Sequence, residues 1–121
     1  MKKLTQQEEM VMKSIWQIGL GAVRDFIEVL PEPHPPYTTV ASIVKNLEKK
    51  GYLSSRKFGN TYVYLPIVTE EKYKARFLSN FVNDYFENSY QKLVSFFAKD
   101  ERISAEELKE IVNIIEKKDK K

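Results

Sequence analysis

Apolar residues recur at helical spacing in the first thirty residues of the chain. The first stripe predicts a helix from about residue 5 to 18, and Thr5 with Glu8 forms the capping box that starts it. A shorter helix follows and ends at the proline cluster of residues 31–36, because proline disfavours the helical conformation in the residue before it. The two stripes consist of Val11, Met12, Ile15 and Trp16, then of Val23, Phe26, Ile27 and Leu30.

A third helix is predicted over residues 37–50, and Gly51 is a suitable stop for it. Its apolar stripe predicts one side packed in a core. The opposite side is polar and carries two cations and no acid. The stripe is Val40, Ile43, Val44 and Leu47, and the polar side is Thr38, Ser42, Lys45 and Lys49, flanked by Thr39, Ala41 and Asn46.

The next segment, residues 52–65, favours strands. Aromatic and β-branched residues lie on both sides of a turn at residues 58–60, which predicts a β-hairpin closed by Pro66. Arg56 and Lys57 fall near its tip.

From Thr69 onward the pattern is helical, and a bend is expected near Asn88-Ser89. The capping box of Ser104 and Glu107 predicts the start of a last helix. The fold class is therefore mainly α with a small β wing. We expect a winged helix-turn-helix head over residues 1–68 and a helical dimerisation domain over residues 69–121.

Charge is concentrated in the middle of the chain. Residues 1–35 carry 4 basic and 5 acidic side chains, residues 36–68 carry 5 and 1, and residues 69–121 carry 11 and 11, so the excess of +4 falls on the third helix and the hairpin. Three helices followed by a hairpin are the winged-helix order, in which the third helix enters the major groove and the wing touches the backbone. The expected DNA contacts are Tyr37, Thr38, Thr39, Ala41, Ser42, Lys45, Asn46, Lys49, Arg56 and Lys57.

A broad apolar band in the C-terminal helices needs cover, because the short head offers little surface for it. Plain core is one interpretation, and a second copy of the chain is the other. A two-fold pair would set two recognition helices about one DNA turn apart and predicts a palindromic operator. The expected interface residues are Tyr73, Phe77, Phe81, Tyr85, Leu93, Phe97, Leu108, Ile111 and Ile115.

Several function classes lack support. There is no cysteine, no Gly-rich phosphate loop and no Ser-His-Asp or His-Glu arrangement, and the lone His34 sits in the proline cluster. We therefore expect no enzyme, cofactor or metal site.

The chain has no signal peptide and no apolar run of membrane length, which predicts a cytoplasmic protein without membrane insertion. A winged-helix module for protein-protein contact, with no DNA-reading role, stays the alternative function.

The order of these pieces resembles the BlaI/MecI (penicillinase repressor) family of bacterial regulators. The resemblance rests on Leu4-Thr5-x-x-Glu8-x-x-Val11-Met12-x-x-Ile15-Trp16, on Thr39-Val40 with Leu47-x-x-Lys50-Gly51, and on the wing Phe58-Gly59-Asn60. It spans essentially the whole chain. It implies a repressor that binds dyad-symmetric DNA as a homodimer, and as a partner a membrane sensor-protease or its product signal.

The chain departs from that family at three places. Ala41 and Asn46 stand where members often carry arginine, so different bases are expected to be recognised. The scissile Asn-Phe pair of the family is Ser95-Phe96 here, and an Asn80-Phe81 pair lies elsewhere, inside the long helix. The C-terminal cysteines by which copper-responsive relatives bind metal are absent.

Overall fold

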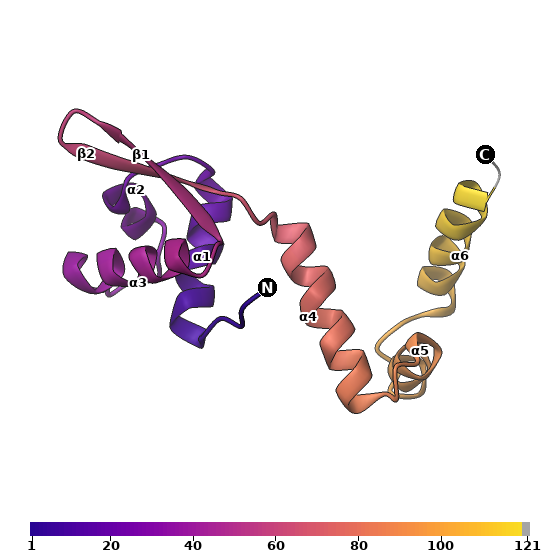
Figure 1. Cartoon of the computed structure of the whole chain (residues 1–121). Helices are drawn as coiled ribbons and strands as arrows, with labels where there is room; N and C mark the ends of the chain where they lie inside the picture. The colour runs from indigo at the N-terminus through magenta and orange to yellow at the C-terminus, as the bar shows by residue number, and fades with distance from the viewer. Residues whose placement is uncertain (120–121) are drawn as a thin grey trace. The chain divides into compact units, whose positions relative to one another are not determined.

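The computed structural model describes residues 1–119, which form six helices and one two-stranded antiparallel sheet (Figure 1). The elements in chain order are α1 (Gln6–Ile18), α2 (Val23–Glu28), α3 (Tyr37–Lys49), β1 (Leu53–Phe58), β2 (Thr61–Pro66), α4 (Glu70–Tyr85), α5 (Tyr90–Lys99) and α6 (Ala105–Asp119). This order confirms the mainly α fold class with a β wing.

The chain divides into two compact units. We call Met1–Lys74 the head and Ala75–Lys121 the C-terminal unit. The division falls inside α4, beyond the domain boundary expected after residue 68, because Tyr73 in the first turns of α4 packs against the core of the head. Within residues 1–119, every helix falls short of the length and hydropathy that a membrane span requires.

α1 begins and ends at the residues that the sequence indicates. The Thr5 side chain accepts a hydrogen bond from the Glu8 amide at 3.1 Å, and the Glu8 carboxylate accepts one from the Thr5 amide at 2.9 Å. These bonds satisfy two of the free amides at the helix start. At the other end Gly19 has a φ of 90°, in the left-handed region that favours glycine.

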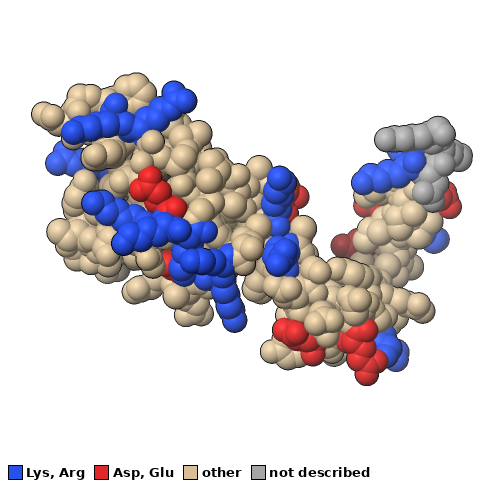
Figure 2. All heavy atoms as spheres, in the orientation of Figure 1, with Lys and Arg blue, Asp and Glu red and all other residues tan. Residues whose placement is uncertain are grey.

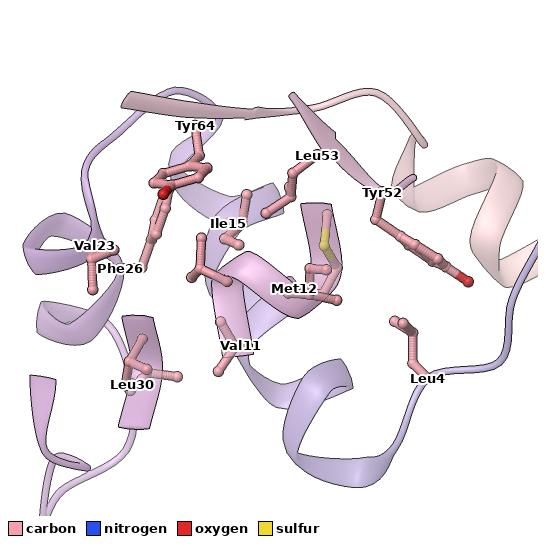
Figure 3. Packing of buried hydrophobic residues seen from close by; sticks show 13 residues of the cluster. Leu4, Val11, Met12, Ile15, Val23, Phe26, Leu30, Tyr52, Leu53 and Tyr64 are labelled. Carbon is pink, nitrogen blue, oxygen red and sulfur yellow. The ribbon is translucent and has the colours of Figure 1, made fainter. Parts of the chain in front are cut away.

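The core of the head draws side chains from α1, α2, α3 and the hairpin (Figure 3). Phe26 is fully buried, and burial of a side chain of this size stabilises the fold by about 1.5–3 kcal/mol. Leu30, expected as the last apolar residue of the second helix, instead lies beyond the end of α2. It precedes Pro31, which disfavours helical backbone there, but it is still buried.

The hairpin pairs Leu53 with Pro66 and Phe58 with Thr61, so Pro66 is the last residue of β2 rather than the residue after it. Gly59 opens the two-residue loop with a φ of 61°, as in a type II′ turn. The sheet is tied to the α1-α2 connection, because the backbones of Gly21 and Tyr64 exchange hydrogen bonds of 3.1 and 2.8 Å.

The C-terminal unit contains most of α4 together with α5 and α6. The bend expected near Asn88-Ser89 is a complete break, since Glu87 and Asn88 have φ values of 53° and 59° and cannot continue a helix. The Ser89 side chain then caps α5 by accepting from the Lys92 amide at 3.1 Å. The capping box of α6 is confirmed by the two Ser104-Glu107 bonds, of 3.0 and 2.9 Å.

Candidate nucleic-acid interface

α3 has one buried side and one exposed side. Val40, Val44 and Leu47 have no exposed surface. Ile43, expected in the core with them, is only partly buried because it lies at the edge between the two sides. The residues of α3 expected to contact DNA are all exposed except Ala41, which is half-buried: Tyr37, Thr38, Thr39, Ser42, Lys45, Asn46 and Lys49.

A shallow depression of about 670 Å³ runs between the exposed side of α3 and the start of α1. Hydroxyl, amide and ammonium groups line it, and these are the groups that bond to base edges and phosphates. Thr39 is exposed but does not line this depression. The lining residues are Thr5, Gln7 and Glu8 from the α1 end, and Tyr37, Thr38, Ala41, Ser42, Ile43, Lys45, Asn46 and Lys49 from α3.

Glu8 is the one acidic residue in that lining, and it is 3% exposed. Its Oε1 atom accepts from the Lys50 ammonium at 2.5 Å and from the Thr5 amide at 2.9 Å, and its Oε2 atom accepts from the Asn46 side-chain amide at 2.7 Å. Burial by itself raises the pKa of Glu8, but the bonds from Lys50, Thr5 and Asn46 outweigh it and hold that pKa below its ordinary value. The carboxylate is therefore charged, and its two oxygens are held by hydrogen bonds. The Lys50 ammonium compensates its negative charge, so Glu8 adds little net negative charge to the depression.

The wing adds positive charge beside α3. Arg56 and Lys57 are exposed near the tip of the hairpin, as expected, and the Lys57 ammonium lies 5.7 Å from the centre of the Tyr62 ring. The Ser55 hydroxyl donates to the Glu48 carboxylate, which ties β1 to α3. Figure 2 shows basic side chains of the head over the hairpin and again over the helices beside it. Such a surface suits the phosphate backbone of a nucleic acid.

Comparison with known proteins decides the family. The model of the penicillinase repressor family matches residues 4–117 of this chain. The chain belongs to the penicillinase repressor family. Members of this family are transcriptional repressors rather than enzymes.

Individual relatives agree over almost the full length. The methicillin resistance regulatory protein MecI of Staphylococcus aureus (strain N315) is 26% identical over 117 residues, which cover 96% of this chain and 95% of that protein. The penicillinase repressor of Bacillus licheniformis is 29% identical over 120 residues, which cover 96% of this chain and 94% of that protein. A solved structure of an organohalide-sensing transcriptional regulator is alike in fold alone, with a TM-score of 0.50 at 15% identity over 95% of this chain and 62% of that one.

The sequence alone did not indicate part of the lining of the depression. Thr5 and Gln7 line the depression, although their capping pattern signals only a helix start. The Lys50 ammonium bonds to Glu8 and to the Lys3 carbonyl oxygen, at 3.0 Å, within the head. Nothing local indicates these contacts, because Asn46 and Lys50 lie 38 and 42 residues from Glu8 along the chain.

The apolar band of the C-terminal unit is largely open to solvent in the single chain. Its aromatic rings contact one another within the unit, with Phe81 4.9 Å from Tyr85 and Phe86 5.8 Å from Phe96 between ring centres. Of the expected interface residues, Phe81, Leu93 and Leu108 are partly buried. The exposed ones are Phe77, Tyr85, Phe97, Ile111 and Ile115, at 53, 73, 42, 44 and 55%.

Tyr73, also expected at the interface, has its partners inside the head. Its ring lies 5.4 Å from that of Trp16 and 6.0 Å from that of Tyr52, and its hydroxyl donates to the Glu9 carboxylate at 2.6 Å. Burial and this bond raise the pKa of Tyr73 well above its ordinary value. The Trp16 indole donates to the Val68 carbonyl oxygen at 2.9 Å, so the segment that leads into α4 is fixed to the head.

Proposed function

We propose that this repressor binds a palindromic DNA operator as a homodimer, with α3 in the major groove and the hairpin against the phosphate backbone. The exposed side of α3 carries the proposal. It offers Lys45 and Lys49 beside a row of hydroxyl groups, and the one acid of the depression is already paired. The proposed DNA contacts are Tyr37, Thr38, Thr39, Ser42, Lys45, Asn46, Lys49, Arg56 and Lys57.

The apolar surface of the C-terminal unit supports the homodimer. Among the described residues of that unit, Val82 is the one large apolar side chain that is buried, whereas eleven are exposed. An apolar surface of this extent on a small unit is typical of an association interface. We propose that a second copy covers it through Phe77, Phe81, Tyr85, Leu93, Phe97, Leu108, Ile111 and Ile115.

The test starts from random DNA, because the operator is found by selection. The full chain should enrich one motif that reads the same on both strands, with half-sites about one helical turn apart. Fluorescence anisotropy with that motif should then give tight binding that falls steeply with added salt. Enrichment of no motif, or binding no tighter than to scrambled DNA, would favour the protein-protein module instead.

Lys45→Ala tests the placement of α3. We expect roughly tenfold weaker binding to the selected motif. Loss of a lysine-phosphate contact should also lower the slope of log K against log salt concentration by about one. Lys13→Ala is the matched control, since Lys13 is an exposed lysine of α1 that does not line the depression. Equal losses in the two variants would contradict the proposed orientation.

The partner that relieves repression is proposed on the family resemblance alone: a membrane sensor-protease or the signal that it produces. Ser95-Phe96, in the place of the scissile pair of the family, lies inside α5. Cleavage there requires local unfolding of α5 and a protease that accepts serine in the first position.

A further inference from the structure

Among the α3 residues that line the depression, Asn46 is the one whose side chain is held by a hydrogen bond within the described part of the chain. Its Nδ2 group donates to the Glu8 Oε2 atom at 2.7 Å, and a carboxylate oxygen can only accept. The amide nitrogen must therefore face Glu8. The Oδ1 atom receives no donor in the described part of the chain, and the exposed side chain lines the depression.

Glu8 itself cannot turn. Two donors, the Thr5 amide and the Lys50 ammonium, hold its Oε1 atom, and the residue is almost fully buried. Its Oε2 atom is left for Asn46 alone. The charge and position of one buried carboxylate therefore set which end of the Asn46 amide faces outward.

We propose that Glu8 is a positioning residue that turns the Asn46 carbonyl oxygen toward DNA, so that Asn46 selects a base with an exocyclic amine, adenine or cytosine, in the major groove. This inference rests on the proposed function. Adenine N6 and cytosine N4 are the major-groove donors, whereas guanine O6 and thymine O4 only accept. An outward acceptor favours the first pair and leaves the second pair facing it without a hydrogen bond.

Glu8→Gln is the informative variant. The Thr5 amide and Lys50 still require an acceptor, so they hold the oxygen of the new side chain and leave its NH2 group toward Asn46. That NH2 group donates, and Asn46 must turn its own oxygen inward and its NH2 group outward. The expected preference at the contacted base pair then changes from adenine or cytosine to guanine or thymine, on the same strand.

The experiment is binding-site selection from random DNA with the wild-type chain, Glu8→Gln, Asn46→Ala and Lys50→Ala. The wild type should prefer adenine or cytosine roughly tenfold at one position of each half-site, and the enriched motif itself shows which of the two. Asn46→Ala should lose that preference, and Glu8→Gln should invert it. Lys50→Ala, which removes an ion pair but leaves the Asn46 bond, should keep the base preference even where overall affinity falls.

Each other result overturns the inference. Asn46 is exposed, so its alanine variant should fold, and an unchanged motif in that variant removes Asn46 from base recognition. A Glu8→Gln variant with wild-type circular dichroism and an unchanged preference removes Glu8 from the positioning role. A wild-type motif with no adenine or cytosine position overturns the inference while the proposed function stands, whereas the absence of any wild-type motif overturns both.

Discussion

The head and the C-terminal unit handle their apolar residues in opposite ways. Among the described residues, thirteen of the fourteen buried apolar side chains belong to the head, while eleven of the nineteen large exposed ones belong to the C-terminal unit. The head is complete as a single chain, and its charged surface is directed outward. The C-terminal unit has helices with well-formed caps, but most of its large apolar side chains are exposed in the single chain, so under the proposed homodimer we expect its stability to depend on association.

The largest expected effect is in the core of the head. Phe26→Ala empties a fully buried site and should lower the free energy of unfolding by about 3–5 kcal/mol, measured by urea denaturation. The loss should be the same at low and at high protein concentration, because the cavity lies within one chain. A loss that depends on concentration would show that the head also relies on association.

The next effect belongs to the apolar surface of the C-terminal unit. Phe97→Asp places a charge where we propose that a second copy packs, and should weaken dimerisation by about 2–3 kcal/mol, which is about a hundredfold. Sedimentation equilibrium measures it. Phe58→Asp is the matched control, because Phe58 is an equally large exposed residue at the wing tip, 60% exposed, and should leave the dimer intact. A monomeric wild type would show that the C-terminal unit does not rely on a second copy of the chain.

Local sequence signals predicted the fold well where the physical cause is local. Thr5 with Glu8 and Ser104 with Glu107 mark helix starts because each box is made within one turn. The stripe through Val40 predicted which side of α3 is buried, because helical periodicity alone decides it.

The sequence predicted less where the cause is tertiary. The break after α4 has Glu87 and Asn88 at positive φ. Glycine is the usual sequence signal for such a conformation, and neither position is a glycine. Tyr73 has the same spacing as the rest of the apolar band, but its partners Trp16 and Glu9 come from the opposite end of the chain. The orientation of the Asn46 amide could not be predicted from nearby residues either, because it depends on the Glu8 carboxylate in α1.

The buried and exposed capping boxes should respond differently to acid. The pKa of Glu8 lies below its ordinary value in the folded head, so the stability that its charge adds is complete above about pH 4.5 and is lost as the pH falls through the folded value. Glu8→Gln should therefore cost about 1–3 kcal/mol near neutral pH and less below pH 4.5, by urea denaturation. Glu107→Gln is the control: the pKa of Glu107 is also lowered, by its bonds to Ser104, but the group is fully exposed and its effect should be smaller.

The smallest expected effects come from the two capping hydroxyls. They allow a direct comparison of the head with the C-terminal unit, because each caps the start of one helix. Thr5→Ala and Ser104→Ala each remove one bond at a helix start and should each cost about 1 kcal/mol. Hydrogen exchange of the amides in α1 and α6, at two protein concentrations, resolves the two losses. The α1 amides should respond equally at both concentrations, because the head folds within one chain. The α6 amides of Ser104→Ala should exchange faster at the lower concentration, since the proposed dimer would dissociate there and no longer protect them. Equal rates would mean that the C-terminal unit holds its helices without a second copy.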